Sequence, residues 1–154
     1  MTDGIHSAAD VAKWLLRRNN DEMELDDADY ITNMKLQKLL YYAQGTFLGM
    51  TGKPLFADEL FAWTHGPVVP SVYREYSQYK KNGIPYTENP QEHYSDEENE
   101  LLEQVYCYFG QYAAWKLRSM THNERPWKST KHNDVIPLDV IRDFFKEEYV
   151  DESA

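Results

Sequence analysis

A histidine spaced two residues before a glutamate is the first pattern in this chain that could do chemistry. His122-Asn123-Glu124 has the His-x-Glu spacing at which zinc deaminases place a metal ligand and a general acid/base. That site also needs a Pro-Cys-x-x-Cys pair, and here Pro126 is followed by Trp127. The spacing alone therefore does not predict a deaminase.

The other side chains that could do chemistry are scattered along the chain. No two of the five histidines stand four residues apart, as they do on the metal-binding helix of a zincin. Cys107 is the single cysteine, and its aromatic neighbours favour packing over an activated thiolate. The glycines form neither GxGxxG nor GxxxxGK[ST]. We expect no catalytic residue, no metal and no cofactor, and an enzyme built on His65, His122 and Glu124 is the alternative.

Two motifs have the residue types of a partner-binding site. In the first, Gly66-Pro67 predicts a turn that presents the rings around it, and the second, residues 121–127, is rich in polar and aromatic groups outside regular structure. The alternative is that Trp127 covers the core and that the second motif only ends a helix. The candidate partner-binding residues are Trp63, His65, Tyr73, His122, Arg125 and Trp127.

The element expected to position both motifs is a central helix. Thr32 can cap it, and its apolar residues recur at spacings of three and four: Leu36, Leu39, Leu40, Ala43 and Phe47. Gly52 permits a left-handed exit and Pro54 cannot continue the helix, so we expect it to end near Met50. Lys35 and Lys38 lie beside the buried stripe, where we expect salt bridges with nearby acids, and phosphate binding is the alternative.

Around this helix the sequence predicts further helices. They should begin at Ser7, Pro70, Ser95 and Pro137, and a further helical segment with Ala114, Leu117 and Met120 inward should follow Gly110. We expect the first to stop at Asn19-Asn20, residues 21–29 to form a solvated acidic loop, residues 121–131 to form a loop, and residues 147–154 to fray. Gly110 either breaks or kinks the helix there. The predicted fold is mainly α, a single compact domain of five to six helices with a small antiparallel β element at Phe56–Trp63.

The order of the motifs KLQKLLYYAQG, PLF, AW and HGPVVPSVYREY, followed by THNERPW, closely resembles the SocA-like antitoxin family, also called the Panacea domain. GepA-type phage-associated proteins are similar to it. The resemblance covers residues 8–145 within one domain of residues 1–154. It implies an antitoxin that neutralises a cognate protein toxin by direct contact. The toxin would be encoded by an adjacent gene, and a protease could take part if the toxin is delivered for degradation. A phage-associated or regulatory adaptor is the alternative.

Composition restricts the class of partner. Sixteen basic and 26 acidic residues give a net charge of −10, which repels phosphate backbones and anionic membrane surfaces. We therefore expect no nucleic-acid partner and no membrane partner. The lone cysteine and the lack of a basic start followed by an apolar run favour a cytoplasmic protein.

Overall fold

The computed structural model describes residues 5–25 and 29–150. Its α-helices are α1 (Ala8–Leu25), α2 (Asn33–Thr51), α3 (Pro70–Glu75), α4 (Asp96–Phe109), α5 (Ala114–His122), α6 (Arg125–Lys128) and α7 (Leu138–Glu148). The strands are β1 (Phe61–Trp63) and β2 (Gly66–Val68), and a 3-10 turn, η1 (Ser77–Tyr79), follows α3. The prediction of a mainly α domain is confirmed. The described residues form seven α-helices, one more than the upper end of the predicted range of five to six, and the short α6 was not predicted.

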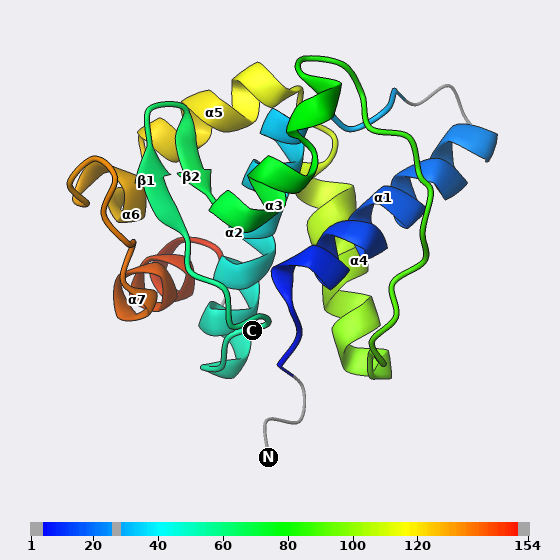
Figure 1. The fold of residues 1–154 in the computed structure, drawn as a ribbon. Helices are drawn as coiled ribbons and strands as arrows, with labels where there is room; N and C mark the ends of the chain where they lie inside the picture. The colour runs from blue at the N-terminus through cyan, green and yellow to red at the C-terminus, as the bar shows by residue number, and fades with distance from the viewer. Residues whose placement is uncertain (1–4, 26–28, 151–154) are drawn as a thin grey trace.

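Helix α2 is the centre of the fold, as predicted (Figure 1). The α1 and α4 helices lie on one side of it, α6 and α7 lie on the other, and α5 crosses its N-terminal end. Thr32 Oγ1 accepts a hydrogen bond from the Lys35 amide, and Gly52 ends the helix at φ 77°. Both predicted ends are thus confirmed, and they are set by local chemistry: a capping hydroxyl at one end and a residue without a Cβ at the other.

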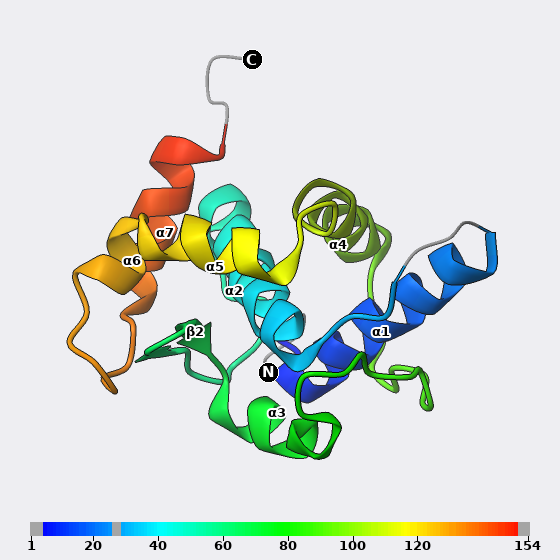
Figure 2. The ribbon, with the colours of Figure 1, turned by 90° about the horizontal axis from the view of Figure 1, so that it is seen from above.

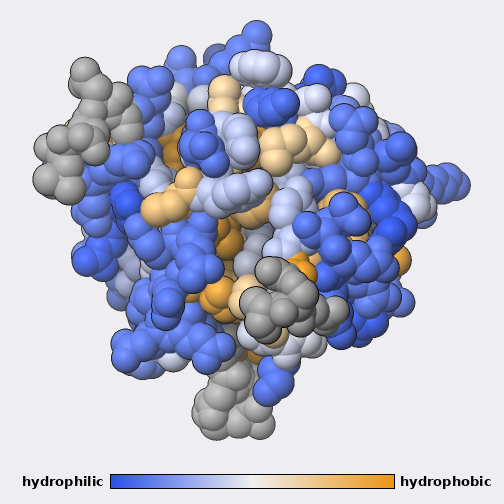
Figure 3. Space-filling model, turned by 180° about the vertical axis from the view of Figure 1, so that it is seen from behind, coloured by the Kyte–Doolittle hydropathy of each residue, from blue (hydrophilic) through white to orange (hydrophobic). Residues whose placement is uncertain are grey.

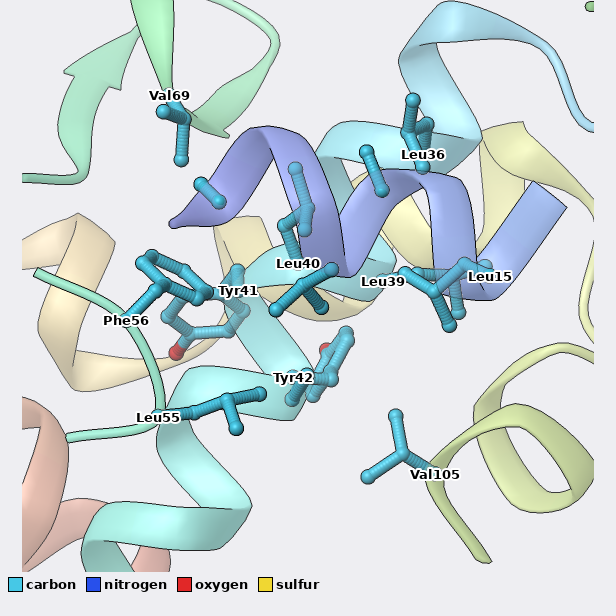
Figure 4. Packing of buried hydrophobic residues seen from close by; sticks show 14 of the residues in the cluster. Leu15, Leu36, Leu39, Leu40, Tyr41, Tyr42, Leu55, Phe56, Val69 and Val105 are labelled. Atoms are coloured by element: carbon cyan, nitrogen blue, oxygen red, sulfur yellow. The ribbon is translucent and has the colours of Figure 1, made fainter. Parts of the chain in front are cut away.

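The core forms around α2, and the predicted apolar stripe is buried along its whole length. Leu39 and Leu40 are inaccessible to solvent, and Figure 4 shows them directed toward side chains from neighbouring elements, with Leu15 of α1 close to Leu39. Tyr41 and Tyr42 are buried as well. Because apolar surface of this kind contributes about 25 cal/mol for each Å² removed from water, burial of the α2 stripe stabilises the fold.

The first helix does not stop where the sequence predicted. Helix α1 continues through Asn19-Asn20 to Leu25, so part of the expected acidic loop is helical, while residues 26–28 of that loop lie outside the described residues. Asn19 is buried, and its Nδ2 donates to the Asp29 carbonyl and to Tyr106 Oη. Tertiary contacts with α4 override the weak local preference for a stop.

The β element is shorter than predicted and lies later in the chain. Phe61–Trp63 pairs antiparallel with Gly66–Val68, whereas Phe56 makes only an isolated parallel bridge with His6. The turn is at Thr64-His65, so Gly66 and Pro67 belong to β2 and are not the turn itself. Glycine is still the residue expected at position 66, because the backbone there has a φ of 114°, which residues with a Cβ rarely adopt.

The start of α4 is as predicted, because Ser95 forms a capping box with Glu98. At Gly110 the helical pattern is interrupted, so that α4 and α5 are two separate helices and not one kinked helix. The predicted loop over residues 121–131 is wrong in part, because α5 reaches His122 and α6 occupies Arg125–Lys128. Helix α7 reaches Glu148 within the segment expected to fray, and residues 151–154 lie outside the described residues.

Candidate functional site

A groove of about 1030 Å³ opens beside the N-terminal half of α2. Residues of α2, the β1–β2 hairpin, α3 with η1, and the start of α5 line it, and Figure 2 shows α5, β2 and α3 arranged around that end of α2. Three of the predicted site residues, Trp63, His65 and Tyr73, are among its lining. We call this hollow the α2 groove. Its volume is at the upper end of the range for ligand sites, so it can hold several side chains of a partner.

The rings in the groove come from separate elements and are held by contacts with one another. Trp63 of β1 and Tyr73 of α3 pack edge to face with their ring centroids 5.4 Å apart. Tyr73 is 39% exposed, and the exposed His65 accepts a hydrogen bond at Nδ1 from Arg118 Nε at 3.1 Å. Aromatic groups that are already held in place lose little conformational entropy when a partner binds.

His122 and Trp127, from the second predicted motif, do not line the α2 groove. The two rings stack with centroids 4.0 Å apart, and Trp127 Nε1 donates to the Trp63 carbonyl at 2.8 Å. Both side chains are half-buried. Burial lowers the pKa of His122, with Arg118 adding to the effect, so its ring is neutral at pH 7. The two motifs thus contact each other, and the residue 121–127 motif holds the backbone of the hairpin at Trp63.

Arg125 faces a different part of the molecule. Its guanidinium donates to Glu147 of α7 at 3.2 Å and lies over the ring of Phe144, 5.6 Å from the centroid. The structure therefore does not bring Arg125 together with the residues of the α2 groove. Its use in partner binding would require a surface that includes α7.

The side chain of Lys38 lies at the base of the groove. Its side chain is buried, and Nζ donates to the Pro67 carbonyl at 3.1 Å, where the sequence predicted a salt bridge. Burial lowers the pKa of Lys38 to about 7, and the nearby Arg118 contributes to the shift. Gly66 makes room for this side chain, since a Cβ at Gly66 would lie 2.6 Å from Lys38 Cε.

Glu124 belongs to a separate buried cluster. Its carboxylate accepts hydrogen bonds from the hydroxyls of Tyr41, Tyr42 and Tyr149 at 3.0, 3.0 and 2.6 Å. Burial raises the pKa of Glu124, against the opposing effect of the three hydroxyl donors. We call these four residues the tyrosine–glutamate cluster. The cluster joins α2 to the segment before α6 and to the end of α7, so it stabilises the packing of these elements.

The enzyme alternative required His65, His122 and Glu124 to share one hollow. His65 lines the α2 groove, but neither His122 nor Glu124 does. Among the described residues, no group of three or more histidine, cysteine or acidic side chains is placed to hold a metal ion. The three residues of the enzyme alternative therefore do not share one hollow, and the α2 groove itself is lined by rings and lysines.

Sequence reasoning missed Trp115, the most exposed large apolar side chain among the described residues. It lies on α5, lines the α2 groove and is 70% exposed. A signal for it did exist: the inward stripe of α5, Ala114, Leu117 and Met120, leaves the residue after Ala114 pointing outward. Large exposed rings beside a concavity are typical of binding anchors.

The face turned away in Figure 1 is mostly hydrophilic at its edges, with hydrophobic residues showing in its middle (Figure 3). A second hollow of about 370 Å³ lies between α2, α4 and the end of α7, lined by residues that include Met50, Tyr108 and Val150. It is smaller than the α2 groove and holds none of the predicted site residues. No helix in the described part of the chain is both long and apolar enough to span a bilayer.

Comparison with known proteins identifies the family of this chain. Residues 36–128 match the family described as "Antitoxin SocA-like, Panacea domain", so the chain belongs to that family. Over 59 residues it is 49% identical to Antitoxin SocA of Caulobacter vibrioides (strain NA1000 / CB15N), a match that covers 38% of this chain and 30% of that protein. No solved structure matches this chain.

Proposed function

We propose that this protein is the antitoxin of a toxin–antitoxin pair and that it neutralises a cognate protein toxin by binding it directly. The family match over residues 36–128 carries the proposal. Trp63, Tyr73 and Trp115, the aromatic residues of the α2 groove, all fall inside the matched region. The part of the chain that relates it to antitoxins therefore also presents rings suited to anchoring a protein partner.

The proposed activity is binding and not catalysis. The buried acid Glu124 is bonded by three tyrosine hydroxyls, and the His122 ring stacks on Trp127, so neither is presented to a substrate in the groove. Neutralisation then needs only a complex that covers the active surface of the toxin. The toxin would be the product of an adjacent gene, and both proteins would act in the cytoplasm.

Co-expression tests the proposal. Each gene adjacent to the one for this chain is expressed alone, and any product that arrests growth is then expressed with and without this protein. We expect growth to be restored and the two proteins to purify together in one complex. Restoration of growth without a complex would overturn direct neutralisation, and failure to restore growth would overturn the antitoxin function. Lower toxin levels only in cells with an intact protease would indicate delivery for degradation in place of masking.

A further inference from the structure

The α2 groove differs in charge from the rest of the molecule. The chain carries a net charge of −10, yet none of the described residues that line the groove is acidic. Three lysines line it instead: Lys38 on α2, and Lys80 and Lys81 after η1. A concave site with charges of one sign concentrates the field of those charges and attracts a ligand of the opposite sign.

The lysines differ in what they can offer a ligand. Lys80 and Lys81 are exposed at the groove and can contact a ligand directly. Lys38 is 1% exposed, and the one acceptor bonded to its ammonium is the Pro67 carbonyl, a neutral group. Because the pKa of this buried lysine is lowered to about 7 and it has no carboxylate partner among the described residues, an acidic ligand in the groove above it would favour its charged form.

The remaining lining supplies apolar contact area. Trp63, Tyr73 and Trp115 present their rings to the groove, and Val68 and Met34 add aliphatic surface. A polyanion such as RNA carries charge along its whole length, so the part outside the groove would be repelled by the acidic molecule, whereas a short segment can keep its charges within the groove. A short acidic segment that also carries aromatic or large apolar side chains matches both the lysines and the rings.

We propose that the α2 groove binds an acidic, aromatic-bearing segment of the partner protein, with its carboxylates at Lys80 and Lys81 and its apolar side chains against Trp63, Tyr73 and Trp115. This inference deepens the proposed function and rests on it for the identity of the partner. The chemistry of the groove itself can be tested without a toxin. A segment of this kind gains contact area from the rings and orientation from the charges.

The first experiment uses two labelled synthetic octapeptides, one alternating phenylalanine with glutamate and one alternating phenylalanine with lysine. Fluorescence polarisation measures their binding to the full chain. We expect the acidic peptide to bind and the basic peptide to bind at least about 10-fold more weakly, with the affinity for the acidic peptide falling as salt rises. Equal binding of both peptides, no binding of the acidic one, or tighter binding of a single-stranded RNA octamer would overturn the inference.

Two pairs of variants then locate the site. Trp115→Ala should weaken binding of the acidic peptide about 30-fold, the loss typical of an interface anchor, whereas Tyr108→Ala, a change to an exposed ring outside the groove, should leave it unchanged. Lys81→Glu should weaken it about 10-fold, and Lys53→Glu, the same charge change at an exposed lysine that does not line the groove, should not. All four residues are exposed, so the variants should fold. A loss confined to Tyr108→Ala would assign binding to the hollow at α4 and overturn the inference.

The same variants are then measured against the toxic product of the adjacent gene. If the wild type binds that product and Trp115→Ala binds it equally well, the antitoxin function stands and the assignment of the groove fails. If the wild type binds the acidic peptide through the groove but binds no toxic product, the groove chemistry stands and the proposed function fails. The two failures are therefore distinguishable.

Discussion

Substitutions of Glu124 in the tyrosine–glutamate cluster should lower the free energy of unfolding by amounts that can be estimated from its hydrogen bonds. Replacing Glu124 by alanine removes the acceptor of three hydrogen bonds and leaves the hydroxyls of Tyr41, Tyr42 and Tyr149 without it. Each buried polar group left unsatisfied costs about 1 kcal/mol or more, partly offset because a buried carboxylate no longer has to be desolvated. We expect Glu124→Ala to lower the free energy of unfolding by about 3 kcal/mol. Glu124→Gln keeps one carbonyl acceptor and should lower it by about 1 to 2 kcal/mol.

The pH dependence of the same cluster gives a second readout. Because the pKa of Glu124 is raised in the folded protein, the folded state holds its proton up to a higher pH than the unfolded state does. The contribution of Glu124 to the free energy of unfolding is therefore fully present below the ordinary pKa of glutamate, and it is lost as the pH rises through the pKa of Glu124 in the folded protein. The difference in the free energy of unfolding between wild type and Glu124→Gln should therefore shrink as the pH rises.

Urea denaturation followed by circular dichroism at a series of pH values measures both effects. Glu100→Gln, a change to an exposed glutamate on α4, is the matched control and should alter stability by less than about 0.5 kcal/mol. A loss below about 1 kcal/mol for Glu124→Ala would show that the three hydroxyls do not depend on this carboxylate. A wild-type advantage over Glu124→Gln that grows as the pH rises would refute the raised pKa.

Other changes test the core, the hairpin and the site. Leu39→Ala should cost about 2 to 5 kcal/mol in a denaturant melt, and a loss below half a kcal/mol would mean that Leu39 is not packed as described. Gly66→Ala should cost about 1 kcal/mol or more because of its positive φ and the proximity of Lys38, so an unchanged melt would contradict that geometry. Lys38→Met should have a higher free energy of unfolding than wild type near pH 6. This advantage should narrow as the pH rises from about 7 to 10.5, because the folded wild type has lost the lysine proton over that range while the unfolded chain still holds it, so wild type becomes more stable. A difference that stays constant with pH would argue against the lowered pKa. Trp127→Ala should cost about 2 kcal/mol or more and Trp115→Ala less than about 1, in thermal melts of both; the reverse order would exchange the core and surface roles of the two rings.

Features fixed by neighbouring residues were predictable from the sequence. The ends of α2 depend on Thr32 and Gly52, and the start of α4 depends on Ser95 and Glu98, all within one turn of the helix they bound. The extension of α1 through Asn19 was not predictable in this way. Asn19 is held by Tyr106, 87 residues further along the chain, and no local pattern records such a contact.

Part of the candidate site was predictable from the sequence, and part of it depends on contacts between distant residues. Residue types suggested that Trp63, His65 and Tyr73 share a surface, and the structure does place them in one groove. The lysines of that groove come from α2 and from the segment after η1, so their convergence depends on tertiary packing. The role of each residue in partner binding stays a prediction until variants are measured.

A binding measurement with purified proteins is the sharpest test of whether this chain neutralises a toxin by direct contact. The toxic product of the adjacent gene is titrated into this protein in a calorimeter, and the mixture is then separated by size. If neutralisation is by direct contact, we expect saturable binding at a fixed stoichiometry and a single co-eluting complex, with no protease present. Two separate peaks and no binding heat at micromolar concentrations, with a toxin that this chain does neutralise in cells, would contradict it.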